Sequence, residues 1–142
     1  MTEFERCLEE RRIIRVEATY KMIGKELDGA IYDLRSAEES SHTGDYKWAS
    51  IQAYYSMFHA AKALVLKKGY REKSHYCLLV ALRELYIKSK ELGQELADSF
   101  ELAMDSRHEA DYALMFDEDS AKIAIENAKI FLRKTQELLK NG

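Results

Sequence analysis

Apolar residues recur at helical spacing along most of the chain, and this pattern predicts a succession of amphipathic helices. The expected helices cover residues 2–11, 18–40, 45–67, 74–91, 94–115 and 119–140. Residues 11–16 break the helical period, so we expect an extended segment there. Turn-forming residues at 40–45, together with Gly69 and Gly93, separate the helices. Because short connections join long helices, the prediction is an all-α, up-and-down bundle of four to five helices.

The predicted helix 45–67 differs from the others because apolar residues cover nearly its whole circumference. A helix that is apolar on all sides is expected in the middle of a bundle. Asp45 is suited to cap the start of this helix, and Ser74 is suited to cap the start of the next one.

The composition favours a single helical domain. The chain has 142 residues, no proline and six glycines, and 33% of its residues are charged. Its net charge of −3 argues against a protein that coats nucleic acid without specificity. Cys7 and Cys77 are the only cysteines and lie in no C-x-x-C or cysteine/histidine motif, so the sequence indicates neither zinc nor a disulfide framework.

The N-terminal segment is charged and lacks the apolar core of a signal peptide. No apolar run approaches the length of about 18–20 residues that a membrane span requires. We therefore expect a cytoplasmic protein without a membrane partner. No phosphate-binding glycine loop, dinucleotide fingerprint or zinc-protease motif occurs, so the sequence predicts no cofactor.

Charge is distributed unevenly along the chain. Residues 62–90 contain eight basic residues against two acidic ones, and residues 91–119 contain ten acidic residues against one basic one. One interpretation is that two neighbouring helices attract each other. The other is that the basic segment forms a surface for a polyanion or an acidic partner.

Arg107 is the one basic residue of the acidic segment, and it falls on the apolar stripe of the predicted helix 94–115. A guanidinium does not lose its charge, so burying it without a partner is very costly. Asp111, one helical turn later, can pair with it. Two interpretations stay open: a buried ion pair within the bundle, or an arginine that faces a cleft or a second subunit.

His108 lies beside that stripe, with Asp105 and Tyr112 on its own face of the helix. A histidine can act as a general acid or base near neutral pH, although an isolated surface histidine commonly has no role. These three side chains can also touch one metal ion. Three ligands on a single helix are a weak signal, so we predict no metal site.

Two further groups of residues can contribute to a binding site. Tyr55, His59 and Lys62 are spaced to form a polar edge on the otherwise apolar helix 45–67. They either contribute to a site or are core polar groups, with the lysine reaching water. Ser74 and His75 begin a helix and can hold an anion there, although capping alone also explains Ser74.

Three sequence pieces, "AYYSMFHAAKAL" (53–64), "KSH" (73–75) and R-x-x-A-D-Y (107–112), occur in an order and spacing that resemble the HEPN domain, in particular the small stand-alone prokaryotic HEPN proteins. On this resemblance we divide the chain into an N-terminal extension, residues 1–16, and a HEPN-like helical bundle domain, residues 17–142. The resemblance implies a homodimer in which two copies of the motif helix line one cleft.

Many HEPN proteins are metal-independent ribonucleases with the motif R-x(4–6)-H, and Arg107 matches the arginine of this motif. The histidine positions are occupied by Tyr112, Ala113 and Leu114. His108 directly follows the arginine, so on a helix it points about 100° away from it. A tyrosine, with a pKa near 10, is a poor base at neutral pH. The departure therefore argues against ribonuclease activity.

Stand-alone HEPN proteins are often encoded beside a minimal nucleotidyltransferase, with which they form a toxin–antitoxin pair, and a tyrosine near the motif can be modified by that partner. The resemblance thus implies a protein that binds nucleotide or RNA phosphate through Arg107, oriented by Asp111, with Tyr112 as the first candidate for modification. Two alternatives stay open. One is a ribonuclease toxin in which His108 or Tyr112 replaces the histidine, and the other is a structural dimeric module without catalysis.

Overall fold

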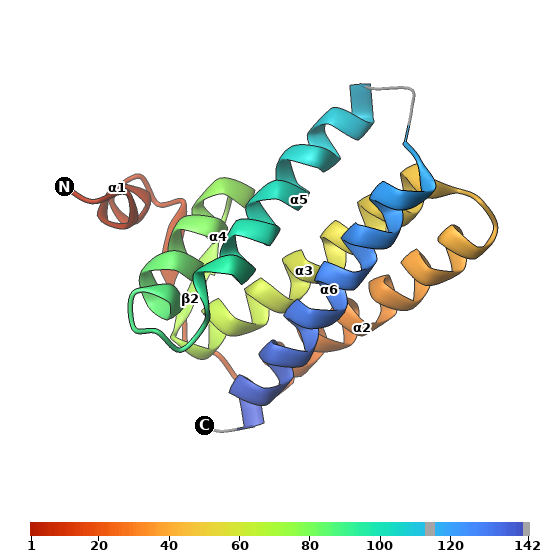
Figure 1. Cartoon of the computed structure of the whole chain (residues 1–142). Coiled ribbons are helices and arrows are strands. Elements are labelled where there is room, and N and C mark those ends of the chain that lie inside the picture. Colours follow the sequence, from red (N-terminus) through yellow and green to blue (C-terminus); the bar gives the residue numbers. More distant parts are fainter. Residues whose placement is uncertain (113–115, 141–142) are drawn as a thin grey trace.

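The computed structural model describes the backbone of residues 1–112 and 116–140 and the side chains of residues 1–105 and 116–140. The elements in chain order are α1 (Glu3–Glu9), β1 (Ile13–Arg15), α2 (Tyr20–His42), α3 (Tyr46–Lys67), β2 (Tyr70–Glu72), α4 (His75–Leu82), the π-helical η1 (Arg83–Ile87), α5 (Gln94–Tyr112) and α6 (Glu118–Lys140). The long helices run side by side, and α1 and α4 lie at one end of the bundle (Figure 1). The predicted all-α bundle is confirmed.

Helix α3 is the centre of this bundle, as its apolar circumference predicts. It packs against α2, α6, α5 and α4. Small residues such as Ala30 on α2 and Ala128 on α6 are fully buried and let the helix backbones approach closely. The largest fully buried side chains are aromatic residues from three helices: Tyr54, Phe100 and Phe131. Burying such rings contributes a large share of the folding free energy.

Side-chain caps define where the helices begin. Asp45 Oδ1 accepts a hydrogen bond from the Trp48 amide at 3.4 Å, and Ser74 Oγ accepts one from the Cys77 amide at 3.0 Å. Both predicted caps are confirmed. Such caps satisfy backbone amides that have no partner within the helix.

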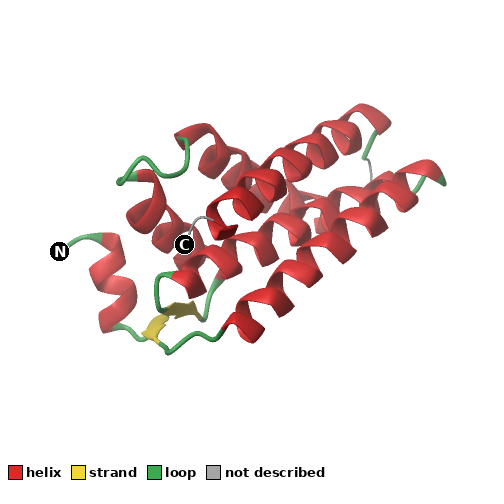
Figure 2. Cartoon of the chain, turned by 90° about the horizontal axis from the view of Figure 1, so that it is seen from below, coloured by secondary structure: helices red, strands yellow, loops and turns green. Residues whose placement is uncertain are grey.

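A two-stranded antiparallel ribbon joins the N-terminal segment to the bundle, as Figure 2 shows from below. Ile13 pairs with Glu72 and Arg15 with Tyr70, and the Ile13 side chain is buried. The extended segment predicted at 11–16 is confirmed for residues 13–15, whereas Arg11, with a φ of 60°, and Arg12 lie in the turn before the strand. Its partner, β2, has no sequence signal, because three residues are too few to show a period. Gly69 has a φ of +89°, which suits glycine, in the turn that leads from α3 into β2.

The predicted helix 74–91 is only partly correct. The α-helical conformation ends at Leu82, and residues 83–87 form a π-helical turn instead. The hydroxyl of Tyr86, within this turn, donates a 2.6 Å hydrogen bond to the Leu64 carbonyl of α3. The π-helical turn thus coincides with a tertiary contact to α3. Helical periodicity in the sequence does not predict such a turn.

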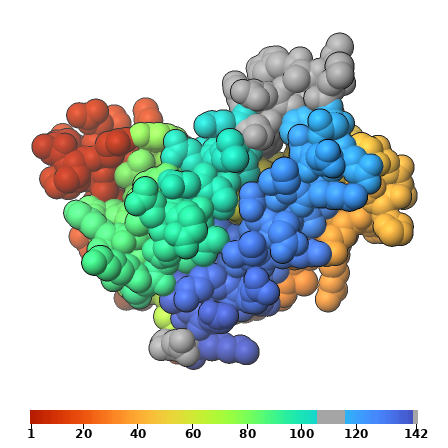
Figure 3. All heavy atoms as spheres, viewed as in Figure 1, coloured from red at the N-terminus to blue at the C-terminus, as the bar shows by residue number. Residues whose placement is uncertain are grey.

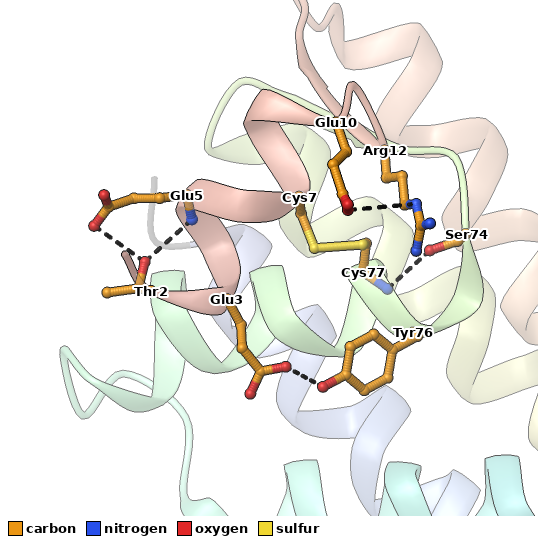
Figure 4. The surroundings of a disulfide bond; sticks show 9 residues. All are labelled: Thr2, Glu3, Glu5, Cys7, Glu10, Arg12, Ser74, Tyr76 and Cys77. Carbon is orange, nitrogen blue, oxygen red and sulfur yellow. Dashed lines mark hydrogen bonds and ion pairs between the residues drawn. A yellow bond between two sulfur atoms is a disulfide. The ribbon is translucent and has the colours of Figure 1, made fainter.

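Cys7 of α1 and Cys77 of α4 form a disulfide, which the sequence does not indicate (Figure 4). Their Cα atoms lie 6.1 Å apart although the residues are 70 positions apart in the sequence. The spacing of cysteines in a sequence can reveal a metal-binding motif. It does not reveal a disulfide between two helices that are far apart in the chain, because that bond requires the two cysteines to come close in the fold. Within the described part of the chain, no helix has the length and apolar character needed to cross a membrane.

Candidate functional site

His75, the first residue of α4, packs against α3 through a hydrogen bond and ring contacts. Its Nδ1 atom shares a 2.5 Å hydrogen bond with the hydroxyl of Tyr54, a residue that is completely buried. Its imidazole also stacks on the ring of Phe58, with the centroids 4.3 Å apart and the planes inclined by 22°. The fold thus brings "AYYSMFHAAKAL" and "KSH" together, although they are separated along the chain.

Phe58 connects this histidine to a group of charged residues. The Lys62 ammonium lies 5.4 Å from the centroid of the Phe58 ring, within the range of a cation–π interaction. The ring of His59 lies 5.7 Å from the same ring. Figure 1 shows α3, which carries all three residues, between its neighbours in the bundle. We call Tyr54, Phe58 and His75 the aromatic cluster.

Two carboxylates of α2 face the charged residues of α3, and we call Glu26, Asp33, His59 and Lys62 the polar cluster. His59 Nδ1 lies 2.8 Å from Glu26 Oε1, and His59 Nε2 lies 3.4 Å from Asp33 Oδ2. Lys62 Nζ lies 3.3 Å from the second oxygen of Glu26. All four side chains are 20–29% exposed. Water therefore screens the attraction between Glu26 and Lys62 only partly. His59 and Lys62 are thus paired with acidic groups of α2.

The three carboxylates near Lys62 and His59 differ in their electrostatics. Burial alone raises the pKa of Glu26, but the hydrogen bond with His59 and the charge of Lys62 outweigh it and lower that pKa. Burial raises the pKa of Asp33, and the charge of His59 opposes the rise only partly. Burial also raises the pKa of Glu72, on β2, against the opposing charge of Lys62. Glu26 is therefore the carboxylate whose charged form the fold favours.

Close approach of α2 to α3 is needed to build this cluster. A Cβ atom at Gly29 would lie 3.3 Å from Cγ of His59, which is tighter than ordinary contact. Glycine at this position leaves room for the imidazole between Glu26 and Asp33. A glycine inside a helix normally reduces the stability of that helix. At Gly29 the close packing of His59 against α2 compensates for this loss.

Helix α5 reaches the aromatic cluster through Phe100, whose ring lies parallel to that of Tyr54 at a centroid distance of 5.8 Å. Position 107 comes two helical turns after Phe100 on the same helix. The side chains of Arg107, His108, Asp111 and Tyr112 lie outside the residues whose side chains are described. Their roles therefore stay predictions.

Ion pairs link the basic and acidic segments that the sequence shows. Arg83 lies 3.0 Å from Asp98 and 2.7 Å from Glu101, both on α5. Lys68 lies 2.9 Å from Glu91. Mutual attraction of neighbouring elements therefore accounts for part of the charge pattern. Arg71 and Lys73 are exposed beside the start of α4.

The predicted site residues divide into three groups. Tyr55, His59, Lys62 and His75 come together around Phe58, since the ring of Tyr55 contacts those of Phe58 and His75 at centroid distances of 5.9 and 6.3 Å. Ser74 caps α4 and positions its first turn. The third group is the undescribed set on α5. Among the described side chains, no group of three His, Cys, Asp or Glu is arranged to hold a metal ion.

The sequence does not single out several members of these clusters. Tyr54 and Phe58 are four residues apart within an apolar helix, a spacing that indicates only core packing. Glu26 and Asp33 are seven residues apart and so share a face of α2, which is the one signal that could have suggested a paired acidic site.

The family model for the HEPN domain matches residues 25–138. A protein of Methanocaldococcus jannaschii named "Putative toxin MJ0142" is 31% identical over 131 residues, which cover 90% of this chain and 89% of that protein. A "UPF0332 protein" of Archaeoglobus fulgidus is 34% identical over 108 residues, covering 72% of this chain and 83% of that protein.

Among solved structures, TT1696 from Thermus thermophilus superposes with a TM-score of 0.71. The alignment covers 81% of this chain and 96% of that one, with 22% sequence identity. At this identity the similarity shows that the two chains share a fold.

Proposed function

The chain belongs to the HEPN domain family, and from this membership we propose that it is the HEPN component of a toxin–antitoxin pair whose other member is a minimal nucleotidyltransferase. The observation that carries the proposal is the match to a relative named as a toxin, which extends over nine-tenths of this chain. The similarity therefore extends over most of the helical bundle and is not limited to a single motif.

Arg107 binds the phosphate of a nucleotide or RNA in this proposal. A guanidinium presents paired N–H donors that fit phosphate oxygens, and it keeps its charge at any physiological pH. Asp111, one turn later on α5, orients the guanidinium. The packing of Phe100 on Tyr54 supports this assignment, because it brings α5 against the cluster that holds His75.

The positive groups around Phe58 add to the same site. His75 and Lys62 both contact that ring, and Arg71 and Lys73 are exposed near the start of α4. Lys62 already pairs with Glu26, so it contributes less free charge than its sequence position suggests. We assign phosphate binding chiefly to Arg107, with the other groups in support.

Tyr112 occupies the position where the ribonuclease motif has histidine. A phenol is protonated at neutral pH and does not take up the proton of a 2′-hydroxyl. We therefore propose a binding function for this site, with the Tyr112 hydroxyl as the group that the nucleotidyltransferase modifies.

The proposed assembly is a homodimer in which two copies of Arg107 share one cleft. Exposed apolar side chains on neighbouring helices support an additional interface: Leu102 of α5 is 60% exposed, and Ile123 of α6 is 61% exposed. Ile130, seven residues after Ile123, continues the same stripe of α6.

Co-purification tests the proposal. The tagged chain is expressed with a minimal nucleotidyltransferase, the one encoded beside it where its genome has one, and growth, complex formation and mass are measured. We expect growth arrest by the chain alone, rescue by the partner, and a mass increase that Tyr112→Phe abolishes. Failure to retain the partner contradicts the pairing.

Phosphate binding is tested separately with a fluorescent single-stranded RNA and with nucleotides. Arg107→Gln is expected to weaken binding by about ten-fold or more, as loss of a charge-assisted contact predicts. Arg133→Gln, at an exposed position of α6, is the matched control. RNA cleavage that persists in EDTA and requires Arg107 would instead favour the ribonuclease alternative.

A further inference from the structure

Helix α1 is attached to the bundle by its disulfide and by Phe4 and Leu8, which pack against the core. Cys7 is the one residue of this seven-residue helix that is buried. Phe4 adds an edge-on contact with the Tyr70 ring at a centroid distance of 5.5 Å, and Glu3 accepts a hydrogen bond from the Tyr76 hydroxyl. A helix of this length is not stable alone, so its order depends on these attachments. Figure 3 shows α1 at the periphery, against α4.

A groove of about 350 Å³ opens beside this disulfide. Its lining residues are Glu3, Arg6, Cys7, Glu10, Arg12, Tyr76 and Cys77. Figure 4 shows the sulfur–sulfur bond between α1 and the first turn of α4, with the charged side chains around it. The groove thus places two guanidinium groups and two carboxylates beside the disulfide. Arg12 Nε lies 4.0 Å from Glu10 Oε1, a distance that a ligand's charged groups can compete with at an exposed site.

We propose that this groove is a thiol-exchange site and that Cys7–Cys77 is a reducible clasp for α1. Its ligand is a small thiol of the amino-acid type, which carries both a carboxylate and an ammonium group. The carboxylate pairs with Arg6 or Arg12, and the ammonium pairs with Glu3 or Glu10. The inference does not rest on the proposed function, since it uses only residues of the N-terminal segment and of the first turn of α4.

The exchange step forms one sulfur–sulfur bond and breaks another. The thiolate of the ligand attacks Sγ of Cys7, a mixed disulfide forms there, and Cys77 leaves with the electron pair as a thiolate. A second molecule of the thiol then attacks the mixed disulfide, which releases Cys7 as a thiolate and the ligand as its own disulfide. The protein gains two electrons in total, and these come from the two thiol molecules.

Two features of the structure favour this direction of attack. Both cysteines are buried, and Cys7 at 5% exposed is less completely covered than Cys77 at 1%. Cys77 lies in the first turn of α4, where its amide donates to Ser74 Oγ. The positive end of a helix dipole stabilises a nearby thiolate and so makes Cys77 the better leaving group.

Opening the clasp releases α1 and leaves the bundle folded. β1 stays paired with β2 through the Ile13–Glu72 register, and α3 packs chiefly against α2, α6 and α5. The first turn of α4 then becomes accessible two residues from His75. The redox state of the Cys7–Cys77 bond therefore determines whether the first turn of α4, beside the aromatic cluster, is covered by α1 or accessible to a partner.

The rate of clasp opening tests the groove. The oxidised full-length chain is incubated with cysteine, cysteamine, 3-mercaptopropionate or 2-mercaptoethanol at equal thiolate concentrations, then quenched by alkylation and analysed by mass spectrometry. Cysteine is expected to react about five-fold faster than 2-mercaptoethanol, as one or two exposed ion pairs predict. Arg6→Gln with Arg12→Gln should remove this advantage, and Arg133→Gln should keep it. Equal rates for all four thiols overturn the ligand assignment.

Hydrogen exchange tests the release of α1. Reduced protein and the Cys7→Ser variant are both expected to lose the amide protection of residues 3–9, while α3 stays protected apart from the decrease that the lower global stability causes. If the disulfide opens only at denaturant concentrations that unfold α3, the bond is a permanent staple and the clasp is overturned. If residues 3–9 stay protected after reduction, the clasp is likewise overturned.

Discussion

The hydroxyl of Tyr54, buried in the middle of α3, shares a 2.5 Å hydrogen bond with Nδ1 of His75 at the start of α4. Two residues 21 positions apart thereby hold α4 in place and orient an imidazole toward the ring of Phe58. A short bond of this kind, made in a buried environment, restricts both the position and the tautomer of the histidine. It is the contact that most directly shapes the candidate site.

Removing that hydrogen bond is expected to weaken both stability and site geometry. Tyr54→Phe keeps the ring packing and should reduce the free energy of unfolding by about 1 kcal/mol, the usual net value of one hydrogen bond. Urea unfolding measures the loss, and the NMR shifts of His75 report the change of its environment. Tyr32→Phe, at a residue that is 71% exposed, is the control. An equal effect in both variants would contradict the role of the Tyr54 hydroxyl.

The glycines of α2 provide a matched pair. No atom comes within 4 Å of a Cβ placed at Gly24, whereas a Cβ at Gly29 meets the His59 ring at 3.3 Å. Gly24→Ala should stabilise the protein by about 0.5–1 kcal/mol through helix propensity. Gly29→Ala should gain less or lose stability, because His59 must shift away from Glu26. Thermal unfolding of the two variants decides this, and equal gains would show that α2 does not constrain the imidazole.

Glu26 gives a predicted dependence of stability on pH. Its pKa is lowered in the folded protein, so its contribution is present above the unfolded value of 4.5 and is lost as the pH falls through the folded value. Glu26→Gln should therefore destabilise the protein more at pH 7 than at about pH 3.5. Unfolding free energies at both pH values test this. Glu126→Gln, at an exposed position on α6, should show no such difference.

Tyr86 gives the opposite dependence in alkali. Burial raises its pKa from the ordinary value of 10.0, and its hydroxyl donates to the Leu64 carbonyl. The folded state therefore keeps the proton that the unfolded state loses above about pH 10, and stability falls there by up to about 1.4 kcal/mol per pH unit. Tyr86→Phe should remove this part of the slope. Denaturant unfolding at pH 8 and pH 11 measures it, and an unchanged slope would show that Tyr86 does not contribute.

The disulfide is expected to stabilise the whole chain as well as α1. A cross-link between residues 70 positions apart removes chain entropy from the unfolded state worth up to about 4 kcal/mol. Cys7→Ser and Cys77→Ser should lower the free energy of unfolding by similar amounts, and the double variant should add little to either. Additive losses in the double variant would mean that the two cysteines act separately.

The sequence by itself determined the long helices and their order. Apolar periodicity located α2, α3, α5 and α6, and the oxygens of Asp45 and Ser74 fixed where two helices begin. These features depend on residues that are neighbours in the chain, so local sequence contains the necessary information. The apolar circumference of α3 likewise determined its central position.

Only the tertiary structure decided which distant residues meet. The Cys7–Cys77 bond, the pairing of β1 with β2 and the contacts of His59 with Glu26 all join segments that are separated by 33 or more positions. Each depends on how closely and at what rotation two backbones pack. Many different partners satisfy the same local pattern of apolar and polar residues, so that pattern does not select among them.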